Sequence, residues 1–255
     1  MTEHPAISRD RICVVLVHTR NPLNIGAAAR AMANFGFADL RVVQPFEASW
    51  QEARSAVGAS SILASAREYP TLARAVSDCT LVLGTASIER RQPIRPVISL
   101  PHLGRELPVR FTSGRLAIVF GSEKSGLTND DFTHCAAILH IPTHPVQESM
   151  NLGQAVAVCL YELARHAGPS LPETQTSPSA PPPVTSADRE RLTHSLHRIL
   201  HFSGYIKPGA DQSVLYQIRE MLHRFHLSAN DSHWILGMLA RIERRLAPRG
   251  ARRDA

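Results

Sequence analysis

The chain has 255 residues, of which 44% are hydrophobic and 20% charged, and its formal net charge is +6. This length can bury one large hydrophobic core or two unequal ones, and the composition is that of a soluble globular protein. Because the sequence holds no apolar run of about 18 residues and opens without an apolar segment, we expect neither a membrane-spanning helix nor a secretory signal, and hence a cytoplasmic protein.

The cysteines and histidines do not indicate a metal site. Four cysteines are spread along the chain with neither CxxC spacing nor dense clustering, and the histidines show no ligand pattern. This distribution favours buried, reduced thiols, and we expect no bound metal.

Strand patterns alternate with helical patterns over the first two thirds of the chain. Short apolar runs of buried-strand type cover residues 11–18, 40–44, 80–85, 116–121 and 136–141, and helical patterns cover 25–35, 72–77 and 149–167. This alternation predicts an α/β domain with a mostly parallel sheet over residues 9–167. Ligands of such sheets bind beyond the carboxyl ends of the strands, where the loops described next are expected.

The loop after the first strand leads into an alanine-rich helix that carries a single cation. The segment reads NPLNIGAAARAM, with Asn24 near the start of the helix and Arg30 among small residues. Small side chains around one cation favour a surface on which an anionic polymer lies close to the backbone. Asn24 either contacts a ligand or caps the helix.

The loop after the fourth of these strands reads FGSEKSGLT. Gly121 and Gly126 have the spacing of a phosphate-binding loop, but Leu127 stands where that motif requires Lys, which argues against it. Glycines here let a ligand press against the main chain. Glu123 either accepts hydrogen bonds from a ligand or the loop backbone, or caps a helix that begins near Thr128.

A third loop, IPTHPVQESMNL, runs into a long helix. Ser149 lies where an N-cap or first-turn residue is expected, with Asn151 just inside, and capping alone would explain Ser149. Exposed N–H groups at such a helix start favour acceptors such as a carboxylate. Another small-residue turn, Thr85-Ala86-Ser87, follows the third predicted strand.

The last third of the chain is different in composition. Residues 168–187 are rich in Pro, Ser and Thr and predict a linker. Residues 188–247 carry three apolar stripes at helical spacing, which predict a small helical bundle, and 248–255 are expected to be a disordered tail. After residue 187 there are 12 Lys and Arg against seven Asp and Glu. This basic balance favours binding of a polyanion, unless it is only a solvated helix face.

The three loops together resemble the three motifs of the SpoU/TrmH class of SPOUT RNA methyltransferases. NPLNIGAAARAM is similar to the first motif, IVFGSEKSGLT to the second and IPTHPVQESMNLGQAV to the third, in the same order. The resemblance is closest to the TrmJ subgroup, which methylates ribose in the tRNA anticodon loop. It continues after the linker, in SGYIKP and WILGMLARIERRL. Ser122 departs from the pattern, because TrmJ-like sequences often carry Arg there, and this bears on local RNA contacts.

The resemblance implies a SPOUT fold with a C-terminal trefoil knot, a homodimer, and S-adenosylmethionine as cofactor. Threading of a chain through a loop is so rare that sequence patterns alone would predict an open sheet. The cofactor contacts that the resemblance implies are Thr85, Ala86, Ser87, Gly121, Glu123, Gly126, Ile141, Glu148, Ser149, Met150 and Leu152.

The implied reaction is attack of a ribose 2′-hydroxyl on the methyl group of the cofactor. Arg30, Asn24, Ser149 and Asn151 match the catalytic positions. Since an arginine with a pKa above about 12 is a poor base, we expect Arg30 to bind the phosphate beside the ribose and to stabilise the developing alkoxide. The expected substrate is cytidine or uridine at position 32 of tRNA. Ribosomal RNA as substrate, and an RNA-binding protein without activity, are the alternatives.

Overall fold

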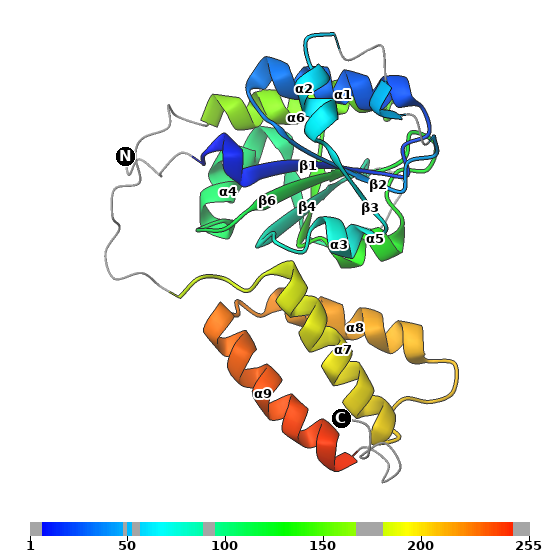
Figure 1. Ribbon diagram of the computed structural model, residues 1–255, viewed down its shortest axis with the longest axis vertical. Helices are drawn as coiled ribbons and strands as arrows, with labels where there is room; N and C mark the ends of the chain where they lie inside the picture. Colours follow the sequence, from blue (N-terminus) through cyan, green and yellow to red (C-terminus); the bar gives the residue numbers. More distant parts are fainter. Residues whose placement is uncertain (1–6, 48–49, 53–56, 89–94, 167–180, 247–255) are drawn as a thin grey trace. The chain divides into compact units, whose positions relative to one another are not determined.

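The computed structural model describes residues 7–47, 50–52, 57–88, 95–166 and 181–246. The chain divides into two compact units, Met1–Ser177 and Pro178–Ala255 (Figure 1). Most of the predicted linker and the whole predicted tail lie outside the described residues.

A seven-stranded sheet, parallel at every pairing, forms the centre of the first unit. The strand order is β3-β2-β1-β6-β4-β7-β5. The five predicted strands are present within one or two residues of their predicted bounds, and β3 and β5 were not predicted. The strands are β1 (Ile12–Val17), β2 (Asp39–Val43), β3 (Arg67–Tyr69), β4 (Leu81–Thr85), β5 (Val97–Ser99), β6 (Leu116–Phe120) and β7 (Ala137–His140).

Helices cover both faces of this sheet (Figure 1). On one face lie α1 (Pro22–Phe35), α2 (Ser60–Ser65), α4 (Leu103–Arg110) and α6 (Leu152–His166), and on the other α3 (Leu72–Ala75) and α5 (Asn129–Thr133). Short 3-10 turns cover Arg9–Arg11, Trp50–Glu52 and Leu100–His102. The alternation of side chains along β1 supplies both cores: Ile12, Val14 and Leu16 pack with the first set of helices, and Cys13, Val15 and Val17 with the second.

Helices α1 and α6 pack closely on the same face of the sheet. A Cβ built on Gly153 would lie 2.7 Å from the Cβ of Ala27, so this contact depends on the absence of a side chain. The side chain of Asn21 caps α1 by accepting from the Leu23 N–H at 2.9 Å, and Pro22 occupies the first turn. Helix α1 therefore begins three residues before the predicted start at Ile25. It ends at Gly36, which has a left-handed φ of 76°.

An ion-pair cluster around the buried Arg41 lies at the amino-terminal ends of the strands. Arg41 is 1% exposed and donates to Asp39 at 2.8 Å and to Asp78 at 2.9 Å. Arg115 pairs with both carboxylates as well. Burial opposes ionisation of the two aspartates, but the hydrogen bonds and charge of Arg41 outweigh it and hold the pKa of each below its usual value.

The described residues of the second unit form three helices, as predicted: α7 (Ser186–Phe202), α8 (Asp211–Arg224) and α9 (Ala229–Leu246). Leu192, Ile218, Leu222 and Leu239 form its buried centre. Helix α7 begins at Ser186, before the predicted end of the linker, because Thr185 caps it by accepting from the Asp188 N–H.

Candidate cofactor site

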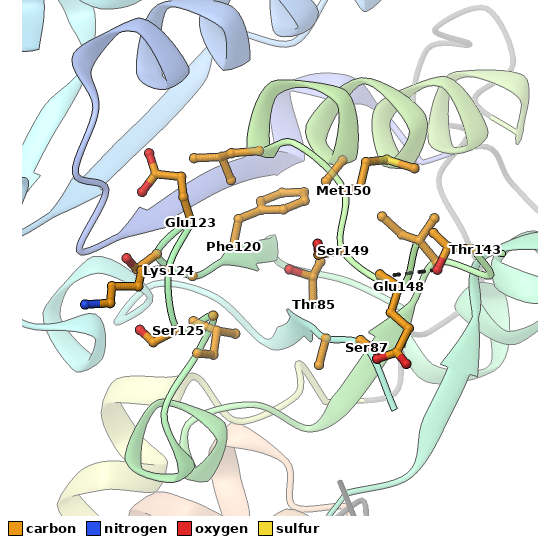
Figure 2. A pocket seen from close by; sticks show the side chains of 18 residues that line it. Thr85, Ser87, Phe120, Glu123, Lys124, Ser125, Thr143, Glu148, Ser149 and Met150 are labelled. Atoms are coloured by element: carbon orange, nitrogen blue, oxygen red, sulfur yellow. Dashed lines mark hydrogen bonds between the residues drawn. The ribbon is translucent and has the colours of Figure 1, made fainter. Parts of the chain in front are cut away.

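A cavity of about 440 Å³ opens at the carboxyl ends of β4, β6 and β7, next to the start of α6 (Figure 2). Its volume lies in the range of small-molecule sites. All eleven residues predicted to contact the cofactor line it. In Figure 2 the side chains of Thr85 and Ser149 point into its middle.

The cavity has further lining residues that were not predicted. Phe120 and Leu127 flank the two glycines of the second motif and supply apolar surface. Thr143 bridges the third loop by donating from its hydroxyl to the Glu148 carbonyl at 3.2 Å. The motif ranges contained these residues, but only the folded loops show which side chains reach the cavity.

The loop after β6 folds back on itself beside the cavity. The Gly126 N–H donates to the Ser122 carbonyl at 2.7 Å, and Gly126 has a φ of +67°. A Cβ on Gly121 would lie 2.2 Å from the backbone of Gly126 and Leu127, so only glycine fits there. Ser122, at the position that departs from the TrmJ pattern, is 9% exposed and is part of this turn.

The carboxylate of Glu123 joins this loop to the start of α1. One oxygen accepts from the Arg20 N–H at 3.0 Å, and the other from the Asn21 N–H at 3.3 Å and the Asn24 side-chain amide at 2.8 Å. Burial alone would raise the pKa of this carboxyl, but the hydrogen bonds from Arg20 and Asn24 outweigh it and hold the pKa below its usual value. Glu123 is therefore a charged acceptor at neutral pH.

A second hydrogen bond extends this contact to α6. The side-chain oxygen Oδ1 of Asn24 accepts from the side-chain amide of Asn151 at 3.1 Å. The Asn151 oxygen in turn accepts from the N–H groups of Gly153 at 2.9 Å and Gln154 at 3.4 Å. Since each amide donates to one neighbour and accepts from the other, both amide orientations are fixed. We call Glu123, Asn24 and Asn151 the polar chain.

The observed helix caps decide the three capping alternatives that the sequence left open. Glu123 does not cap the helix near Thr128, because Thr128 and Asp131 form a capping box there. Asn24 does not cap α1, because Asn21 does. Ser149 is not the cap of α6, because that helix begins at Leu152 and Asn151 accepts from its first turn.

Arg30 lies apart from the other three predicted catalytic residues. Asn24 and Asn151 are in contact, and Ser149 lines the cavity two residues before Asn151. Arg30 is exposed on α1, is not among the residues that line the cavity, and makes no hydrogen bond or ion pair with another described residue. The structure of a single chain thus brings together three of the four.

The described part of the chain offers neither a metal site nor a membrane-spanning helix. No group of three or more His, Cys, Asp or Glu side chains there could hold a metal ion. None of the helices there has the length and apolar character needed to cross a membrane.

Comparison with known proteins supports one family throughout. Residues 11–161 match the SpoU rRNA Methylase family. Over 92% of this chain and 95% of its relative, 36% of residues are identical to the tRNA (cytidine/uridine/adenosine-2′-O-)-methyltransferase TrmJ of Pseudomonas aeruginosa, strain UCBPP-PA14. The TrmJ of Cronobacter sakazakii, a tRNA (cytidine/uridine-2′-O-)-methyltransferase, is 33% identical over 91% of this chain and 96% of its own length.

A solved structure agrees with the sequence relatives. The crystal structure of TrmJ from Z. mobilis ZM4 matches with a TM-score of 0.76 and 30% identity, over 94% of this chain and 99% of that chain. The expected SPOUT fold, with its parallel sheet and helical extension, is confirmed, whereas the trefoil knot stays a prediction. With matches over both the catalytic motifs and the extension, the chain belongs to the SpoU methylase family and to its TrmJ class of methyltransferases.

Proposed function

We propose that this protein transfers the methyl group of S-adenosylmethionine to a ribose 2′-hydroxyl in the tRNA anticodon loop, at cytidine or uridine 32. The observation that carries the proposal is that the second and third motifs line one cavity and that the polar chain at its rim joins them to the first motif. The TrmJ relatives, which are named as tRNA 2′-O-methyltransferases, support tRNA as the substrate class. Such a substrate implies work in the cytoplasm.

The cavity suits S-adenosylmethionine in shape and chemistry. The glycine loop that lines the cavity packs tightly on itself, because Gly121 has no room for a Cβ against the backbone of Gly126 and Leu127. Apolar surface from Ile141 and Leu152 offers packing for a flat base, and Thr85, Ser87 and Glu148 offer polar groups for a nucleoside and an amino acid. Bound there, the cofactor would supply an activated methyl group.

The polar chain would hold the ribose rather than act as a base. Its amides are fixed at both ends, by the Glu123 carboxylate and by the first turn of α6. A fixed set of donors and acceptors can align a 2′-hydroxyl with the methyl group at small entropic cost. Arg30 would bind the neighbouring phosphate and stabilise charge that develops on the 2′-oxygen, because a guanidinium does not readily accept a proton.

We propose further that two chains pair, with Arg30 of one acting at the cavity of the other. Arg30 is exposed and does not line the cavity of its own chain. Helix α6 buries Leu152, Val156, Leu160 and Leu163 within its own unit, so an interface built on this helix has to use its outer face. Val158 and Tyr161 are exposed there, as is Leu23 on α1, at 37%, 51% and 52%.

Methyl transfer from labelled S-adenosylmethionine to tRNA, followed by mapping of the 2′-O-methyl group, tests the activity. We expect label at nucleotide 32. Label in ribosomal RNA alone would favour the first alternative. If the protein binds RNA but calorimetry detects no binding of S-adenosylmethionine, only the second alternative remains, an RNA-binding protein without activity.

Heterodimers test the pairing. Arg30→Ala should abolish transfer but keep cofactor binding, and Gly121→Ala should impair cofactor binding because its Cβ would meet backbone. Co-expressed and purified as a mixed dimer, the two inactive chains should regain activity, since one site then combines an intact cavity with an intact Arg30. An inactive mixed dimer would mean that Arg30 does not act across the interface.

A further inference from the structure

Two loops meet next to the cavity, at the carboxyl ends of the neighbouring strands β1 and β2. The His18 N–H donates to the Val43 carbonyl at 2.9 Å, and the Phe46 N–H donates to the Thr19 carbonyl at 3.0 Å. These bonds tie the backbone of the two loops together. The backbone positions of Arg20, which follows Thr19, and of Phe46 are therefore fixed relative to each other.

The two loops present a cation stacked on an exposed aromatic ring. The guanidinium carbon of Arg20 lies 5.1 Å from the centre of the Phe46 ring. Phe46 is 72% exposed, so its ring belongs to neither core. A large apolar side chain in this position contributes little to the stability of the fold, because it is not buried. Its contact with Arg20 offsets only part of the cost of exposing the ring to water. We call these two side chains the stacking pair.

The backbone beneath the stacking pair is strained. His18 and Gln44 are the described non-glycine residues with positive φ, at 51° and 44°, and both are exposed. This left-handed conformation costs on the order of 1 kcal/mol for such residues. Both follow directly after their strands, at the edge of the sheet where ligands of parallel sheets bind.

The stacking pair is adjacent to the polar chain. The backbone N–H of Arg20 and the side-chain amide of Asn24 bind the two oxygens of one carboxylate, that of Glu123. In the sheet, β1 lies next to β6, whose loop carries Glu123 and lines the cavity. The cavity thus covers β6, β4 and β7, and the stacking pair continues the same edge over β1 and β2.

We propose that Arg20 and Phe46 stack on a nucleobase of the substrate RNA beside the ribose that receives the methyl group. Exposed aromatic rings and guanidinium planes are the surfaces on which proteins stack unpaired RNA bases. The anticodon loop presents such bases. The positive charge of Arg20 also favours the RNA backbone. This inference rests on the proposed function and adds a substrate-binding surface to it.

Substitutions at Phe46 separate stacking from simple apolar contact. Phe46→Trp keeps a flat ring, Phe46→Leu keeps apolar bulk without one, and Phe46→Ala removes both. We expect the affinity for an anticodon stem-loop RNA to fall about tenfold in the Leu and Ala variants and to stay near the wild type in the Trp variant. Val109→Ala, which truncates another exposed apolar side chain at 77%, is the matched control and should change nothing.

Three measurements make the outcome decisive. RNA affinity, the KM for RNA in methyl transfer, and S-adenosylmethionine affinity are measured for each variant. The proposal expects the first two to change together and the third to stay constant. Equal RNA affinity in the Trp, Leu and Ala variants would overturn it.

The controls also separate this inference from the proposed function. Because RNA affinity is measured without turnover, the stacking pair is tested even if the wild type transfers no methyl group. A wild-type protein that binds RNA but transfers no methyl group would contradict the proposed function, and the test of the stacking pair would still be valid. Arg20→Gln should weaken RNA binding and lower its dependence on salt, and an unchanged salt dependence would exclude a contact between Arg20 and the RNA backbone.

Discussion

At the scale of single residues, the carboxylate of Glu123 holds together groups that are far apart in the sequence. It accepts from the backbone at Arg20 and Asn21 and from the side chain of Asn24, about a hundred residues earlier. Sequence motifs identified Glu123 and Asn24 as site residues, but they did not show that the two bind each other. That contact depends on the placement of β1 next to β6, which no local pattern encodes.

We predict that Glu123→Gln lowers the rate of methyl transfer at least tenfold. A neutral amide turns one acceptor oxygen into a donor, which then opposes the Asn24 amide or a backbone N–H and disturbs the polar chain. Single-turnover kinetics measures the rate, and thermal unfolding shows that the fold survives. Glu106→Gln, which removes a surface carboxylate paired with Arg110 on α4, is the matched control and should keep full activity.

The ion-pair cluster around Arg41 makes a second prediction at this scale. Asp39→Asn should lower the free energy of unfolding by about 2 kcal/mol at pH 7, because it leaves Arg41 and Arg115 with one carboxylate, Asp78. The folded state lowers the pKa of Asp39, so its stabilisation is present above the unfolded pKa near 3.8 and is lost as pH falls through the folded value. Urea unfolding at pH 7 and near pH 3 should therefore show the difference between variant and wild type shrinking in acid; a constant difference would mean that charge is not the cause.

At the scale of helices and strands, the long apolar elements were predictable and the short exposed ones were not. Strand β1 is buried along its whole length, and its apolar run alone identified it. Strand β3 is three residues with mostly exposed side chains, so it has no apolar pattern to detect. Helix α4 contains Pro108, a residue that normally argues against a helix.

Two helical glycines give opposite predictions. Gly153→Ala should lower the free energy of unfolding by about 1–3 kcal/mol, because the new Cβ would lie 2.7 Å from Ala27 and push α1 from α6. Gly237→Ala on α9 meets nothing within 4 Å and should stabilise its helix by about 1 kcal/mol. Chemical unfolding of both variants checks the pair. Destabilisation by both would show that helix propensity and contact distance do not explain these positions.

At the scale of the whole molecule, composition predicted a near-neutral first unit and a basic second unit that binds a polyanion, and the fold is compatible with this prediction. The cavity and the polar chain lie entirely within the first unit, and the sequence of the second unit carries most of the excess of basic residues. Hydrophobic periodicity predicted both units. It does not bear on the knot that the family resemblance predicts, because a knot changes the path of the backbone and leaves the pattern of buried side chains unchanged.

The basic surface of α9 leads to the last prediction. Arg241, Arg244 and Arg245 are exposed near its end, and replacement of all three by Gln should weaken tRNA binding without changing cofactor affinity. If each contacts one phosphate, the slope of log affinity against log salt should fall by about 2. Gln at Arg74, Arg105 and Arg110, three arginines of the first unit, makes a control with the same change in net charge. An equal loss of slope in the control would show that α9 has no special part in binding tRNA and that only the total charge matters.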